Sequence, residues 1–168
     1  MRKAIYLLLV IVALASCSKP ESWHDKEISR AEDLIGNSPD SALAILEAID
    51  PSDLKVDSLK AKFYYLRAYG HVRRNRSMIE DSLITFAHKY YRGKDIVKDI
   101  RSGIALAFYK FWVGDSPGSI AMLDSLTKLP NVPDSLMTEV LRIRVLLGTS
   151  EYQGRQIIPL AKRLHILE

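Results

Sequence analysis

The sequence of 168 residues contains a single cysteine, Cys17, and few glycines and prolines, eight and seven. One cysteine cannot form an intramolecular disulfide, so no disulfide framework holds the fold. The low glycine and proline content argues against a low-complexity or disordered chain. The sequence also lacks a G-x-S-x-G motif, a glycine-rich phosphate loop and an H-E-x-x-H motif. The most recognisable signatures of hydrolases, nucleotide-binding enzymes and zinc enzymes are therefore missing.

Histidine is also scarce, and its spacing does not suggest a metal site. The four histidines are His24, His71, His88 and His165, and none of them forms an i,i+4 pair. A metal site needs ligands that converge on one face, which this spacing does not offer. Pairs of neighbouring carboxylates occur, but charged residues on helices are usually solvated. We therefore predict that the chain is not an enzyme and that it uses no metal or cofactor.

The longest apolar run is at the N-terminus, where Arg2 and Lys3 precede an uninterrupted apolar stretch over residues 4–15. A basic head, a short apolar middle and small residues at a cleavage site are typical of an export signal. About a dozen residues are too few to span a bilayer, which takes roughly 20. We predict a signal peptide over residues 1–16, a polar tether over residues 17–25 and a helical-repeat domain over residues 26–168.

The end of this segment, Leu14-Ala15-Ser16-Cys17, resembles the lipobox of bacterial lipoproteins. In that family the cysteine thiol receives a diacylglycerol, the signal is cut before the cysteine, and the new amine is acylated. The resemblance implies lipidation of Cys17 and attachment to the outer membrane, on a face that the sequence does not specify. An uncleaved anchor, or an ordinary signal followed by an incidental cysteine, is the alternative.

The net charge gives little support to a nucleic-acid partner. Removal of residues 1–16 takes away two of the 24 basic residues and none of the 20 acidic ones, which leaves 22 against 20, a formal charge of +2. The sequence pI near 9.1 is thus raised by the signal. A nearly neutral mature chain lacks the basic excess that typifies nucleic-acid binding.

From residue 26 onward, apolar residues recur at helical spacing, and no segment alternates like a strand. The spacing and the turn residues predict an all-α fold with eight helices, over about residues 26–35, 38–50, 56–74, 77–92, 94–113, 116–126, 134–147 and 157–164. Ser38-Pro39 and Ser116-Pro117 each suit a helix start, with serine as N-cap and proline at the first helical position. Ser77 and Glu80 suggest a capping box for the fourth helix. Its predicted buried stripe is Ile79, Leu83, Phe86 and Tyr90.

The predicted helices pair as long-then-short hairpins, which indicates a repeat. Equivalent small residues in the second helix of each pair, Ala42, Ser82 and Ser119, give steps of about 40 and 37 residues, close to known helical repeats. Segments such as Leu66, Tyr69 and Gly70 followed by Ser82 and Phe86 resemble a degenerate tetratricopeptide unit. The whole chain resembles bacterial envelope lipoproteins with tetratricopeptide-like repeats. The alternative is an irregular helical bundle.

This resemblance implies a lipid-anchored, non-enzymatic scaffold that binds a protein or peptide. The sensory part of a truncated envelope signalling protein is the alternative function. Tyr65, Tyr69 and Arg73 are the residues expected to line a groove, although tyrosines in repeats more often pack between helices. A basic run over residues 67–76 suits either an anionic partner or the C-terminal end of a helix, where cations offset the dipole.

The triplet Asp-Ser-apolar occurs five times, beginning at residues 40, 57, 81, 124 and 134. It resembles the O-glycosylation acceptor of exported proteins in one group of Gram-negative gut bacteria, in which the serine carries the glycan. Ser41, Ser58 and Ser135 are the expected acceptors because they lie near predicted helix starts. Ser82 is expected to be hidden at a helix-packing position. The alternative is that Asp and Ser merely suit the first turn of a helix.

Overall fold

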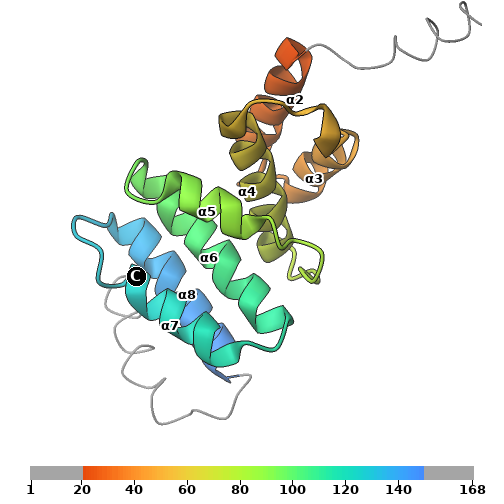
Figure 1. Cartoon of the computed structure of the whole chain (residues 1–168). Helices are drawn as coiled ribbons and strands as arrows, with labels where there is room; N and C mark the ends of the chain where they lie inside the picture. Colours follow the sequence, from red (N-terminus) through yellow and green to blue (C-terminus); the bar gives the residue numbers. More distant parts are fainter. Residues whose placement is uncertain (1–20, 150–168) are drawn as a thin grey trace, which may run out of the picture.

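The computed structural model describes residues 21–149, and these residues form helices joined by short connections, without a strand among them (Figure 1). The elements, in chain order, are α2 (Glu21–Leu34), α3 (Pro39–Glu47), a short 3-10 helix η1 (Pro51–Asp53), α4 (Asp57–Arg73), α5 (Ile84–Tyr91), α6 (Ile96–Trp112), α7 (Ser116–Leu126) and α8 (Asp134–Thr149). The predicted all-α class is confirmed. The predicted helix over residues 157–164, and Cys17, lie outside the described residues.

The helices stack as hairpins of the tetratricopeptide-like kind predicted from the sequence. A long helix packs against the shorter helix that follows it in the pairs α2–α3, α4–α5 and α6–α7. Each short helix also contacts the next long helix, and the long helices α2, α4, α6 and α8 contact one another in succession (Figure 1). No helix in the described part of the chain is long and apolar enough to cross a membrane.

The helix ends follow from local side-chain chemistry. Pro39 begins α3 at a position where its missing N–H costs nothing. The Asp95 carboxylate accepts hydrogen bonds from the first backbone N–H groups of α6, and Asp115, rather than the predicted Ser116, caps α7 in the same way. Gly93 and Gly114 follow α5 and α6 with φ of 72° and 85°, a left-handed conformation that glycine adopts without strain.

Small residues set the distance between neighbouring helices. A Cβ atom on Gly70 would lie 2.8 Å from Cδ2 of Leu43 in α3, and one on Gly103 would lie 2.8 Å from Cδ2 of Leu126 in α7. Ala42 and Ser119, predicted to be small packing residues, are fully buried. These positions let the helix backbones approach closely, as the repeat pattern predicts.

The fourth predicted helix is wrong at its start and in its buried face. Helix α5 begins at Ile84, so Ser77 and Glu80 lie in an irregular segment and form no capping box. Ile79 and Leu83 are 60% and 47% exposed, while the buried face of α5 consists of Ile84, Ala87, His88 and Tyr91. The predicted stripe is therefore rotated by about one residue. Ser82, expected at a packing position, is exposed in the turn before α5.

The tether predicted over residues 17–25 also differs from the structure at its C-terminal end. Residues 21–25 belong to α2, and His24 is only 1% exposed. The His24 ring lies edge-on to Trp23, and its Nε2 atom lies 3.8 Å from the Asp53 carboxylate in η1. The first helix therefore starts earlier than its apolar spacing suggests, because its first turn packs against η1.

Candidate functional site

The basic run near the end of α4 is tied to acidic and backbone oxygens on neighbouring segments. Arg74 and Arg76 bind the Asp40 carboxylate at 2.9 and 3.2 Å, at the start of α3. Arg73 donates a hydrogen bond to the backbone carbonyl of Gly36 at 3.0 Å. These contacts join the end of α4 to the first hairpin.

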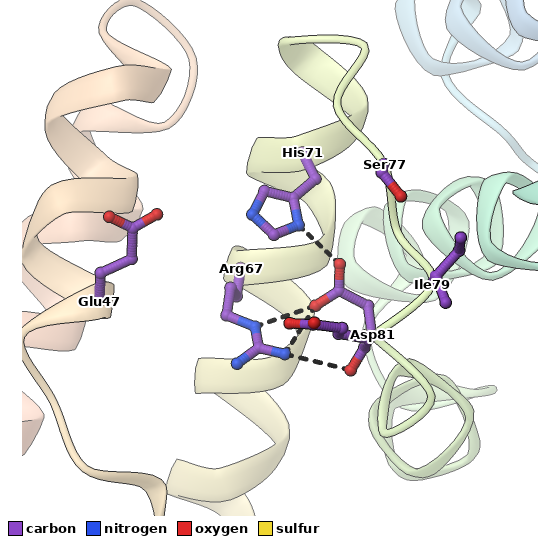
Figure 2. A pocket seen from close by; sticks show the side chains of 7 residues that line it. Glu47, Arg67, His71, Ser77, Ile79 and Asp81 are labelled. Atoms are coloured by element: carbon purple, nitrogen blue, oxygen red, sulfur yellow. Dashed lines mark hydrogen bonds and ion pairs between the residues drawn. The ribbon is translucent and has the colours of Figure 1, made fainter.

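The two remaining basic residues of the run hold the irregular segment over residues 74–83, through Asp81. Arg67 Nε donates to Oδ1 of Asp81 at 2.9 Å, and His71 Nδ1 lies 2.6 Å from Oδ2 (Figure 2). Arg67 and His71 are four residues apart on α4, so they lie on the same face of the helix. Asp81 is only 4% exposed, which makes it the buried centre of this cluster.

Two opposing effects determine the pKa of Asp81. Burial raises this pKa, but the hydrogen bond and the charge of His71, together with the charge and hydrogen bond of Arg67, outweigh burial and hold it below its ordinary value. The carboxylate is therefore charged at neutral pH. The charged Asp81 carboxylate, which is bound by both Arg67 and His71, fixes the irregular segment over residues 74–83 against α4.

A hollow of about 460 Å³ lies beside this cluster, between α3, α4 and the irregular segment (Figure 2). Its lining residues are Glu47, Arg67, His71, Ser77, Ile79, Glu80 and Asp81. Glu47 reaches it from α3, across from the Arg67 and His71 side chains of α4. The hollow thus combines the fixed Arg67 and His71 side chains, two exposed carboxylates and one exposed apolar side chain.

The residues expected to form a groove do not do so. Tyr65 and Tyr69 are each 2% exposed and pack between the long helices, while Arg73 is exposed and faces Gly36. The Tyr69 hydroxyl donates a hydrogen bond to Glu139 of α8, and the Arg101 guanidinium lies 5.4 Å from the centre of the Tyr69 ring. Burial, and then the Glu139 carboxylate, raise the pKa of Tyr69. These tyrosines join α4 to α6 and α8.

Glu32 provides a similar connection between the first three long helices. Lys62 of α4 and Lys98 of α6 lie 2.7 and 3.4 Å from the Glu32 carboxylate of α2. One carboxylate therefore bridges two lysines on successive repeats. This network favours a fixed angle between the hairpins.

The three expected glycan acceptors, Ser41, Ser58 and Ser135, are exposed in the first turns of α3, α4 and α8. Ser82 is exposed as well, but its neighbour Asp81 is buried and bonded. Within residues 21–149 no three histidine, cysteine or carboxylate side chains converge as metal ligands would.

Comparison with known proteins adds no further constraint. No protein-family model, curated protein or solved structure matches this chain. The function must therefore be argued from the geometry of the chain itself.

The anchoring role of Asp81 was not found from the sequence, although a signal for it was present. In the predicted helix over residues 77–92, Asp81 begins an Asp-Ser-apolar triplet that lies beyond the first turn, where the first-turn explanation does not apply. Arg67 and His71 also share one helical face without an acidic partner on that helix. Together these features could have indicated a carboxylate brought to α4 from another segment.

Proposed function

We propose that this chain is a lipid-anchored, non-enzymatic protein-binding module of the bacterial cell envelope, attached to the outer membrane through Cys17. The lipobox supports the anchor, and the stacked hairpins support a binding role. The observation that carries the binding role is Ile79, an apolar side chain that is 60% exposed on a fixed, irregular segment.

The backbone on both sides of Ile79 is anchored. Met78 is fully buried on one side, and Asp81 is bonded to Arg67 and His71 on the other. The Asp81 N–H also donates to the Met78 carbonyl at 2.9 Å, which closes a turn around Ile79. The backbone that carries Ile79 is therefore held in a turn, so little backbone entropy is lost when a partner covers this side chain.

The surroundings of Ile79 indicate the chemistry of the partner. The hollow beside it has a volume within the range of pockets that receive an inserted group. Its exposed carboxylates, Glu47 and Glu80, favour a partner segment that places a basic residue next to an apolar one. We call Ile79 and this hollow the Ile79 surface.

Capture of partners from the native envelope tests this proposal. The lipidated protein should retain a specific protein, and Ile79→Asp should abolish that retention, because a charge at the centre of an apolar contact costs binding energy. Val56→Asp is the matched control, since Val56 is 48% exposed at the start of α4, away from the hollow. Equal retention by the two variants would rule out the Ile79 surface. Recovery of a membrane-spanning regulator would favour the sensory alternative.

A further inference from the structure

A second hollow, of about 370 Å³, lies between α5, α6 and α7, away from the Ile79 surface. Its apolar lining residues are Leu106, Met122, Leu126 and Leu129, from α6, α7 and the turn after α7. Two cations also line it, Lys89 in α5 and Arg92 directly after α5. We call it the α5–α7 hollow. Its volume lies within the range of small-molecule sites, in which apolar walls and a few polar groups are combined.

His88 and Asp99 also line the hollow, and both are held by neighbouring groups. His88 Nδ1 lies 3.1 Å from Ser102 Oγ, whose own hydrogen is donated to the Asp99 backbone carbonyl. His88 must therefore donate its Nδ1 hydrogen to Ser102, which leaves Nε2 of the neutral ring as a hydrogen-bond acceptor. Asp99 Oδ2 accepts the Gly93 N–H at 2.8 Å.

The charges around the hollow leave a positive excess. Lys89 and Arg92 form no ion pair within residues 21–149, and no lining residue from α7 is charged. Asp99, from α6, is the single lining carboxylate, and it is held by Gly93 and faces Nδ1 of His88 at 3.8 Å. Burial lowers the pKa of His88 despite the Asp99 charge, and the charge of Arg92 lowers it further. The ring is therefore neutral at pH 7. Lys89, Arg92 and Asp99 then give the lining a net charge of +1.

We propose that the α5–α7 hollow binds a small amphiphilic anion, a medium-chain carboxylate. The carboxylate lies between Lys89 and Arg92, and the alkyl chain packs on Met122 and Leu129, the partly exposed apolar residues of the lining. The apolar wall excludes fully polar anions, and the two cations disfavour amines of the same length. The site is separate from the Ile79 surface and does not depend on the proposed partner.

Octanoate is a suitable probe, and methionine methyl groups report its position. Met122 lines the hollow, whereas Met78 and Met137 are buried elsewhere and serve as internal references. The lipidated protein in phosphatidylethanolamine nanodiscs, labelled with ¹³C at the methionine methyls, is titrated with octanoate, octan-1-ol and octylammonium. Octanoate should shift the Met122 signal saturably and leave Met78 and Met137 unchanged. Octylammonium should produce no saturable shift.

Charge variants separate the proposed site from general uptake of alkyl chains. Lys89→Gln combined with Arg92→Gln should weaken octanoate binding roughly threefold to tenfold, as expected for loss of two partly solvated ion pairs. Lys26→Gln combined with Arg30→Gln removes the same two residue types from the exposed face of α2 and should leave the affinity unchanged. Unchanged Met78 and Met137 signals establish that each variant is folded.

Three outcomes would overturn the proposal. The first is the absence of a saturable Met122 shift with octanoate, which would mean that the hollow does not bind the anion. The second is equal binding of octanoate and octylammonium, and the third is equal binding of octanoate by the Lys89→Gln, Arg92→Gln variant and by its control. Either of the last two results would mean that Lys89 and Arg92 select no anion.

Discussion

At the scale of single residues, Asp81 has the largest influence on the proposed binding surface. Its carboxylate is buried and joins the segment over residues 74–83 to α4 through Arg67 and His71. A buried carboxylate of this kind is stabilising only while both partners are present, because an uncompensated charge in the interior is costly. The geometry of the segment, and the exposure of Ile79, therefore depend on one side chain.

Asp81→Asn should lower the free energy of unfolding by about 1–3 kcal/mol at pH 7, as expected when charged hydrogen bonds to a buried group are lost. The folded state holds the pKa of Asp81 below its ordinary value of 3.8. The contribution of Asp81 is thus present above about pH 4 and is lost as the pH falls through the folded-state pKa. Urea unfolding at pH 7 and near pH 3 measures both effects.

The difference between Asp81→Asn and the wild type should accordingly shrink at low pH. Glu80→Gln is the matched control, because Glu80 is an exposed neighbour whose carbonyl, not its carboxylate, accepts a hydrogen bond from Arg67. It should change the stability by no more than about 0.5 kcal/mol. A difference between Asp81→Asn and the wild type that stays constant with pH would contradict the assigned role of the carboxylate.

The exposed serines lead to a second prediction at this scale. If Ser41, Ser58 and Ser135 carry glycans, protein from the native host should be heavier than the same chain made in a host without the pathway. Alanine in place of Asp40, Asp57 and Asp134 should remove most of the added mass. Intact-mass spectra of lipid-free protein from both hosts measure this difference, and equal masses would leave the triplets as helix-start chemistry.

At the scale of the elements, the short helices are positioned by the long helices on either side of them. Helix α5 lies against α4 and α6, and Gly103 of α6 leaves room for the His88 ring, whose Cε1 atom would be 3.3 Å from an added Cβ. The buried face of α5 is therefore determined by the polar cluster around Ser102 as well as by apolar periodicity. This explains why α5 turns Phe86 and Tyr90 only partly inward.

Two aspartate substitutions distinguish the observed face from the predicted stripe. Phe108 is 1% exposed in the middle of α6, so Phe108→Asp should destabilise the fold by at least roughly 4 kcal/mol. Leu83 immediately precedes α5 and is 47% exposed, so Leu83→Asp should be tolerated, because a negative charge is favourable at a helix N-terminus. Thermal melts followed by circular dichroism test both. Unfolding by Leu83→Asp would restore the stripe predicted from the sequence.

At the scale of the whole molecule, the stack is a series of hairpins that each contact their neighbours. Glu32 bridges α4 and α6, and Tyr69 and Arg101 connect α4 and α6 to Glu139 of α8. The free energy of unfolding of such a stack is the sum of the stability of each hairpin and of the contacts between successive hairpins. The Ile79 surface and the α5–α7 hollow lie at different positions along the same stack.

Attachment to the membrane is the prediction that concerns the whole chain. Cys17→Ala should leave the protein soluble or unprocessed, because each acyl methylene buried in a bilayer contributes about 0.8 kcal/mol and several chains hold firmly. Phase separation in detergent, with the N-terminus of the product determined by mass spectrometry, measures this. A Cys17→Ala protein that stays in the detergent phase, cut at the same position, would exclude lipidation of Cys17.

The all-α class, the hairpin order and most helix ends could be predicted from the sequence. These features depend on interactions within one or two helical turns: the proline at the start of α3, the glycines after α5 and α6, and apolar residues three or four apart. Such interactions depend little on the rest of the chain. They can therefore be derived from a short window of sequence.

Tertiary packing determines the start of α5, the burial of Tyr65 and Tyr69, and the role of Asp81. Each of these depends on groups distant in sequence: Asp81 is bonded to residues 14 and 10 positions earlier, and Tyr69 to Glu139, 70 positions later. Residues 77–83 have a helix-like pattern but form an irregular segment, because the buried Asp81 carboxylate is bound there by Arg67 and His71. A buried carboxylate needs such partners, which the packing of α4 supplies and local propensity does not.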